Sequence, residues 1–427
     1  MELNNHIIIR NAKIIDVKSE HNNKKKDILI INGVIEDIKD TINYKLPFFE
    51  VKMNNLHVSP GWIDLHARLC EPGLEHRETI KSGLKSASHG GFTAVLVMPN
   101  TNPPIDKKTD IVYLLKEGLH NIVDILPTGC ITANCEQKKI SEMFDMHKHG
   151  ALAFTDDKKN IQNSKLMTIA LEYVKNFGGL IMTTNLDKFL NQDSQINEGV
   201  ISTELGLEPS PELAEDLMVM RNLKVLEYTN SKLHLSTIST KQSVKQIKEA
   251  KKKKLKVSAD VAAHHLILDD QLLNNFDTNL KVIPPLRDEK TRLNLIKGII
   301  DGTIDAISSD HTPIEMERKK CEFEKAEFGM IALETVFPII NTILKDQLEL
   351  EKIIALISSN PRKILGVKQP VIEEGQKANI TLFDPDKKWC YQEDEIQSMS
   401  KNTPFINYEF VGKSVGVINN GKIYINH

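Results

Sequence analysis

Hydrophobic and polar positions follow a repeating pattern through the middle of the chain. From about Pro60 to Gly366, short apolar runs of strand length alternate with amphipathic stretches of helical length. This alternation is typical of βα units that share one parallel sheet. Eight runs have strand character: GWIDLHA, FTAVLVMPN, VDILPTG, ALAFTDD, LIMTTN, LHLSTIS, KVSADVA and DAISSDH. Because eight parallel strands close a (β/α)₈ TIM-type barrel, we predict this α/β fold for residues 57–372.

Residues that start and stop helices support this spacing. Ser210 and Pro211 precede ELAEDLMVMRNLKVLEY, so we expect a cap residue and a first-turn proline there. Gly90 and Gly91 follow ETIKSGLKSASH, where a left-handed cap is expected.

Both ends of the chain have a different, β-type pattern. IIIRNAKIID and DILIINGVIEDI stand near the start, and ANITLFD and VGVINNGKIYI follow Gly375. Asn32-Gly33 and Asn420-Gly421 are strong hairpin-turn signals. We therefore expect residues 1–56 and 373–427 to build one small β-sandwich module together.

Composition narrows the range of partners and compartments. The formal charge of −3 over 427 residues indicates no basic surface for nucleic acid. The five cysteines are odd in number and form no CxxC pair, which argues against a disulfide framework or a thiolate zinc site. The start carries no export-signal pattern and no apolar run is long enough to span a membrane, so we expect a cytoplasmic protein.

In a (β/α)₈ barrel, reactive groups lie at the carboxyl ends of the strands. The first strand run ends near His66 and Arg68, which are two residues apart and therefore project to the same side. The fourth ends in Asp156 and Asp157, and the eighth in Asp310. The fifth and sixth runs end near Thr184 and Thr237.

Ordered sequence blocks of this chain resemble those of dihydroorotases of the multifunctional-complex type, within the amidohydrolase superfamily. The blocks, in order, are PGWIDLHARLCEPGLEHRETIKSGLKSASHGGFTAVLVMPNT, AFTDD, ADVAAHHLILDD, IPPLRDEKTR, GTIDAISSDHTP, FGMIALET, NPRKILG and NTPF. So many blocks in one order are more specific than any single motif.

The resemblance implies a role in pyrimidine biosynthesis. Active members are expected to be binuclear zinc hydrolases that interconvert dihydroorotate and carbamoyl aspartate, using a metal-bound hydroxide and a catalytic Asp. Their pattern has two histidines on the first strand, an Asp on the fourth, one histidine each on the fifth and sixth, and the catalytic Asp on the eighth. An arginine and an asparagine hold the substrate carboxylate.

Only part of that pattern is present. By resemblance, His66, Asp156 and Asp310 match metal ligands, with Asp157 as an alternative to its neighbour, and Asp310 also matches the catalytic residue. The expected histidines are replaced by Arg68, Thr184 and Thr237. Of the substrate-binding positions Asn100 remains, whereas the others are replaced by Cys70, Ile283 and Ile314. Guanidinium and hydroxyl groups are poor zinc ligands, so the metal site looks dismantled.

These departures predict a non-catalytic pseudo-dihydroorotase with no cofactor. The resemblance suggests a homodimer and an assembly partner, with aspartate transcarbamoylase as the candidate. The alternative is an active, zinc-dependent dihydroorotase or a related cyclic-amide hydrolase, such as a hydantoinase or allantoinase. We further predict that Arg68 replaces the metal charge and lies within about 4 Å of Asp310, Asp156 or Asp157.

Overall fold

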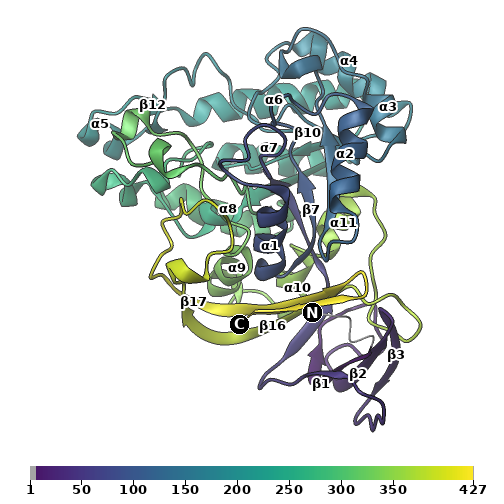
Figure 1. Ribbon diagram of the computed structural model, residues 1–427. Helices are drawn as coiled ribbons and strands as arrows, with labels where there is room; N and C mark the ends of the chain where they lie inside the picture. Colours follow the sequence, from purple (N-terminus) through teal and green to yellow (C-terminus); the bar gives the residue numbers. More distant parts are fainter. Residues whose placement is uncertain (1–5, 427) are drawn as a thin grey trace.

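The computed structural model describes residues 6–426 and has a barrel of eight parallel strands at its centre (Figure 1). Neighbouring strands are adjacent along the chain and run parallel. The strands are β6 (Trp62–Ala67), β7 (Phe92–Val97), β8 (Asp124–Gly129), β9 (Ala153–Phe154), β10 (Ile181–Thr183), β13 (Leu233–Leu235), β14 (Val257–Ala262) and β15 (Ala306–Ser308). Each lies inside one of the eight predicted runs, so the (β/α)₈ prediction is confirmed.

The barrel closes where the segment after β15 meets the end of β6. Ala67 and His311 form a parallel bridge, and the His311 amide donates to the carbonyl oxygen of His66 over 3.1 Å. The buried Asp64 carboxylate accepts hydrogen bonds from the Ser309 amide (2.6 Å) and the Ser309 hydroxyl (2.7 Å). This seam brings the first and last strand ends together, and it places their side chains at one mouth.

Helices surround the barrel, and one predicted cap is confirmed. α1 ends at Gly90, and Gly91 follows with a φ of 93°, a conformation that suits glycine. Ser210 lies in the short strand β12 and bonds to Asn191, so Pro211 takes the N-cap position predicted for Ser210. The α-helices are α1 (Ile80–Gly90), α2 (Lys108–Gly118), α3 (Met143–Lys148), α4 (Ser164–Lys175), α5 (Val200–Leu205), α6 (Glu212–Thr229), α7 (Lys241–Lys252), α8 (Glu289–Ile300), α9 (Val336–Leu344), α10 (Leu350–Ala355) and α11 (Ser359–Leu365).

Shorter elements occupy the loops. A two-stranded parallel pair joins β11 (Ile196–Asn197) to β12 (Pro209–Ser210). The 3₁₀ turns are η1 (Ala133–Cys135), η2 (Ala263–Leu266), η3 (Asp270–Asn275), η4 (Thr278–Leu280), η5 (Met316–Arg318), η6 (Phe323–Lys325) and η7 (Glu393–Glu395).

Strands from both ends of the chain share a second eight-stranded sheet, as predicted. In Figure 1 the purple N-terminal strands and the long yellow C-terminal strands lie below the barrel. β5 (His57–Pro60) connects the two groups, because it pairs with N-terminal β1 on one side and C-terminal β16 on the other. The sheet contains β1 (His6–Ile14), β2 (Lys25–Ile31), β3 (Val34–Lys39), β4 (Phe49–Val51), β5, β16 (Ile380–Cys390), β17 (Glu409–Asn419) and β18 (Lys422–Ile425).

Trp62 packs where the barrel meets this sheet. Its indole ring is fully buried, with its centroid 4.7 Å from that of Phe337 on α9 and 5.5 Å from that of Phe383 on β16. In residues 6–426, none of the helices combines the length and the apolar character needed to cross a bilayer.

We predict that Trp62→Ala lowers the free energy of unfolding by about 3–5 kcal/mol, because it leaves a cavity at this junction. Phe189→Ala is a suitable control, since the Phe189 side chain is exposed, and should change stability by about 0.5 kcal/mol or less. Urea unfolding of both variants measures the difference. Equal effects in the two variants would contradict the assigned packing.

Candidate functional site at the barrel mouth

A buried carboxylate, Asp157, is the centre of the barrel mouth. Arg68 Nε and Nη2 each lie 2.7 Å from its Oδ2 atom, and His66 Nε2 lies 2.8 Å from its Oδ1 atom. Burial alone would raise the pKa of Asp157, but Arg68 and then His66 outweigh it and hold that pKa well below its usual value. The prediction that Arg68 forms an ion pair with a carboxylate of the site is confirmed.

A second cation, Lys158, pairs with the other carboxylate. Its Nζ atom lies 2.9 Å from Asp310 Oδ1 and 3.0 Å from Asp310 Oδ2. His66 Nε2 lies 3.6 Å from Asp310 Oδ1, so the imidazole stands between the two ion pairs. The sequence analysis missed Lys158. The signal was present, because this lysine directly follows the acidic pair at the end of the fourth strand run.

Asp156 has a different environment from Asp157, and its placement among the metal ligands needs correction. One Asp156 oxygen accepts from the backbone amides of Ile131 and Thr132 at 2.8 and 2.9 Å, and the other accepts from the Thr132 hydroxyl. Asp157 lies in the turn that follows, with a φ of 52°, and of the two carboxylates it is the one that contacts His66. Asp157, which the sequence analysis named as the alternative to Asp156, is therefore the carboxylate that lies beside His66.

The two threonines at histidine positions take part in the scaffold. Thr184 Oγ1 lies 2.7 Å from the Asp157 carbonyl oxygen and 2.8 Å from Asn160 Oδ1, so it holds the turn that carries Lys158. Thr237 is buried with a φ of 49°, and its amide donates to Asp260 over 3.0 Å.

A pocket of about 580 Å³ opens above the ion pairs. Asn100 and Ile283, at positions that match substrate contacts by resemblance, line it together with Arg68. Cys70 is buried, and its Sγ atom lies 4.0 Å from the Arg68 carbonyl oxygen. Burial raises the pKa of the Cys70 thiol to about 12, which leaves it a poor nucleophile.

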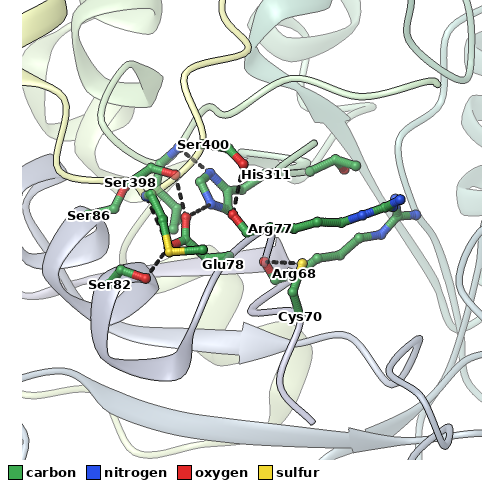
Figure 2. A network of polar contacts seen from close by, with 12 residues as sticks. Arg68, Cys70, Arg77, Glu78, Ser82, Ser86, His311, Ser398 and Ser400 are labelled. Atoms are coloured by element: carbon green, nitrogen blue, oxygen red, sulfur yellow. Dashed lines mark hydrogen bonds and ion pairs between the residues drawn. The ribbon is translucent and has the colours of Figure 1, made fainter. Parts of the chain in front are cut away.

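A buried network supports the mouth from behind. Figure 2 shows Glu78 facing His311 and Ser398, with Arg68 and Arg77 extending past them. His311 Nε2 lies 3.6 Å from Glu78 Oε2, and the Ser398 hydroxyl donates to the same carboxylate. Burial favours the protonated acid, but His311 and then the serines hold the pKa of Glu78 below its usual value. Glu78 therefore joins α1, the strand-eight loop and the C-terminal segment.

Two adjacent histidines lie near the ion pairs. His264 and His265 are buried, and their ring centroids are 4.5 Å apart. Burial, and then the charge of Lys158, lowers the pKa of His264 to about 3. His264 is thus a neutral imidazole beside the Lys158 cation.

The donor set does not fit two zinc ions. Zinc at such sites takes imidazole and carboxylate ligands, and only His66, Asp157 and Asp310 offer them at the positions that the resemblance assigns. Each of the two carboxylates already has a cation within 3.0 Å. Arg68 cannot lose its proton, so a dication at Asp157 would face a permanent positive charge.

Comparisons with known proteins agree on the family and the fold. The profile of the dihydro-orotase-like family matches residues 56–243. A dihydroorotase of Caldicellulosiruptor saccharolyticus is 38% identical over 422 residues, covering 98% of each chain. A dihydroorotase of Thermoanaerobacter sp. is 39% identical over 405 residues, covering 93% of this chain and 92% of its own. Among solved structures, an L-hydantoinase (dihydropyrimidinase) from Arthrobacter aurescens aligns with a TM-score of 0.83 at 20% identity, covering 98% of this chain and 96% of its own.

We predict that Arg68→Met destabilises the fold by about 3–5 kcal/mol, because it leaves Asp157 charged, buried and short of its main partner. Asp157→Asn should also destabilise, since it leaves the guanidinium unpaired. The double variant should be less destabilised than the sum of the two single variants. Denaturant unfolding of all four proteins measures the coupling. Purely additive changes would show that the pair contributes nothing.

Proposed function

This chain belongs to the dihydroorotase family, and from that premise we propose that it is a non-catalytic member whose own cations have replaced the metal charge. The observation that carries the proposal is the pair of contacts from Arg68 to Asp157 and from Lys158 to Asp310. These contacts engage the two carboxylates that a metal site would require. They also fix His66, the remaining imidazole, against Asp157.

Without the metals, the remaining residues offer little of the chemistry that ring hydrolysis requires. Hydrolysis of a cyclic amide at neutral pH needs an activated water and a base for its proton. Asp310 matches the base, but it is held by both oxygens to the Lys158 ammonium group. A water that is to give its proton to Asp310 must therefore compete with the ammonium group for the carboxylate oxygens.

An active hydrolase is the second candidate. Relatives at 34–39% identity, matched over nearly the whole chain, are named dihydroorotase. His66, Asp157, Asp310 and Asn100 remain at the mouth, and the pocket above them has room for a small cyclic substrate. This candidate requires Arg68 and Lys158 to leave the carboxylates when metal and substrate bind. A hydantoinase activity has less support. The fourth strand run ends in AFTDD and lacks the lysine expected there in a hydantoinase.

We expect turnover of carbamoyl aspartate with added zinc to lie at least on the order of 10³-fold below that of the Caldicellulosiruptor saccharolyticus relative. Asp310→Asn is the control, since background activity should be equal in this variant and the unaltered protein. Turnover close to that of the relative, and lost in Asp310→Asn, would overturn the proposal and establish the second candidate. Metal analysis of the same preparations should give less than one zinc per chain.

As a non-catalytic member, the protein is proposed to act in assembly, with aspartate transcarbamoylase as the partner and a homodimer as its own state. Assembly needs an exposed apolar surface, and α6 carries Leu213, Leu217, Met220 and Tyr228 with 38–79% of each side chain exposed. Three of them are spaced four and three residues apart, which places them on one face of the helix.

We predict that light scattering after size exclusion gives a dimer mass for the protein alone and a larger complex with aspartate transcarbamoylase from the same organism. Leu217→Glu with Met220→Glu should weaken one or both associations, because it places charges on the apolar face. Lys45→Glu, in the exposed segment between β3 and β4, is the matched control, since it changes the net charge by the same amount away from this face. A monomer that never co-elutes with the transcarbamoylase would contradict the assembly role.

A further inference from the structure

Two buried thiols meet beside the barrel-mouth pocket and take no part in the ion pairs. The Sγ atoms of Cys130 and Cys135 lie 2.7 Å apart. Cys130 follows β8 and is fully buried, whereas Cys135 ends η1 and lines the pocket of about 580 Å³. A reagent in the pocket can therefore reach Cys135 first.

The loop between them is held in the shape that brings the sulfurs together. Asn134 and Cys135 have φ values of 54° and 52°, so the chain turns back on itself through the left-handed region. The Cys130 amide donates to the Ile105 carbonyl over 2.8 Å, and the Cys135 amide donates to the Thr132 carbonyl over 3.0 Å. Bonding the two sulfurs therefore needs a small shift of side chains and no refolding.

We propose that Cys130 and Cys135 form a reversible disulfide when a peroxide reaches the barrel-mouth pocket. The Cys135 thiolate attacks one peroxide oxygen, which breaks the O–O bond, releases water after protonation and leaves a sulfenic acid on Cys135. The Cys130 sulfur then displaces the sulfenic oxygen as a second water and forms the S–S bond. In total two thiols lose two electrons and two protons, and one peroxide becomes two waters. The reaction is independent of whether the barrel turns over a substrate.

A metal ion is the competing occupant, because Asp156 offers a third ligand atom within 4.8 Å of both sulfurs. The geometry favours the disulfide. A disulfide needs its sulfurs about 2.05 Å apart, a small inward shift. Two thiolates on one zinc, with Zn–S bonds of about 2.3 Å, lie roughly 3.7 Å apart, which requires the loop to open. Asp156 also already accepts three hydrogen bonds, from the amides of Ile131 and Thr132 and from the Thr132 hydroxyl.

The surroundings of Cys130 also fit its part in this reaction. The neighbouring Cys135 and then burial raise the pKa of the Cys130 thiol far above its usual value. Because its thiolate is scarce near neutral pH, Cys130 suits the second step, in which its sulfur displaces the sulfenic oxygen on Cys135.

The test uses the full-length protein treated with hydrogen peroxide, then denatured, alkylated and digested with trypsin. Both cysteines fall in the tryptic segment 117–138. We expect this peptide to lose two hydrogen atoms and to resist alkylation, and dithiothreitol should restore both thiols. Cys130→Ser and Cys135→Ser should each abolish that product. Cys321→Ser with Cys390→Ser is the matched control, which removes the more exposed thiols and should leave the product unchanged.

Three outcomes would overturn the proposal. The first is a peptide 117–138 that stays fully alkylatable while Cys321 or Cys390 is oxidised. The second is an irreversible sulfinic acid on Cys135 without the loss of two hydrogens. The third is one zinc per chain that protects both thiols before any peroxide is added and is lost in Cys130→Ser, which would assign a metal site instead. The wild-type peptide alone decides the first two outcomes, even if a serine variant fails to fold.

Discussion

The structure of the barrel mouth depends on how the negative charge of one buried carboxylate, Asp157, is balanced. Asp157 has only 1% of its side chain exposed, and an isolated buried anion would cost several kcal/mol. A guanidinium group suits this position, because it is a permanent cation and presents two N–H groups to one oxygen. The arginine at position 68 and the anion at position 157 are thus tied to one another, since neither is stable there alone.

The rest of the mouth is arranged around that pair. Asp64 and Ser309 close the barrel and set the ends of β6 and β15 side by side. Thr184 holds the turn from which Lys158 reaches Asp310. Thr184 and Asp310, at positions that match metal ligands in the family pattern, therefore make contacts that hold the mouth together. These contacts explain how the barrel keeps its shape although three of the expected histidines are absent.

The sequence predicted the architecture well, because a parallel barrel is encoded by periodicity over hundreds of residues. The eight strand runs, the Gly91 cap and the shared terminal sheet all follow from local patterns of this kind. The site was harder. Choosing between Asp156 and Asp157 required knowing which carboxylate points into the barrel mouth after a two-residue strand. Ser210 does not cap its helix, because its hydroxyl bonds to Asn191 instead. Lys158 has a flexible side chain whose direction depends on a partner 152 residues away, and no local pattern encodes that contact.

The sheet that β5 joins also bears on how the chain is made. A ribosome releases the N-terminal strands first, yet β5 acquires its neighbour β16 only after more than three hundred further residues have emerged. Glu78, on the first barrel loop, likewise gains its hydrogen bond from the Ser398 hydroxyl only after 320 further residues have been made. Domains usually fold as they leave the ribosome, N-terminal part first. Here the edge of β5 lacks its partner until β16 has been made, and an unpaired strand edge can pair with another chain during that time.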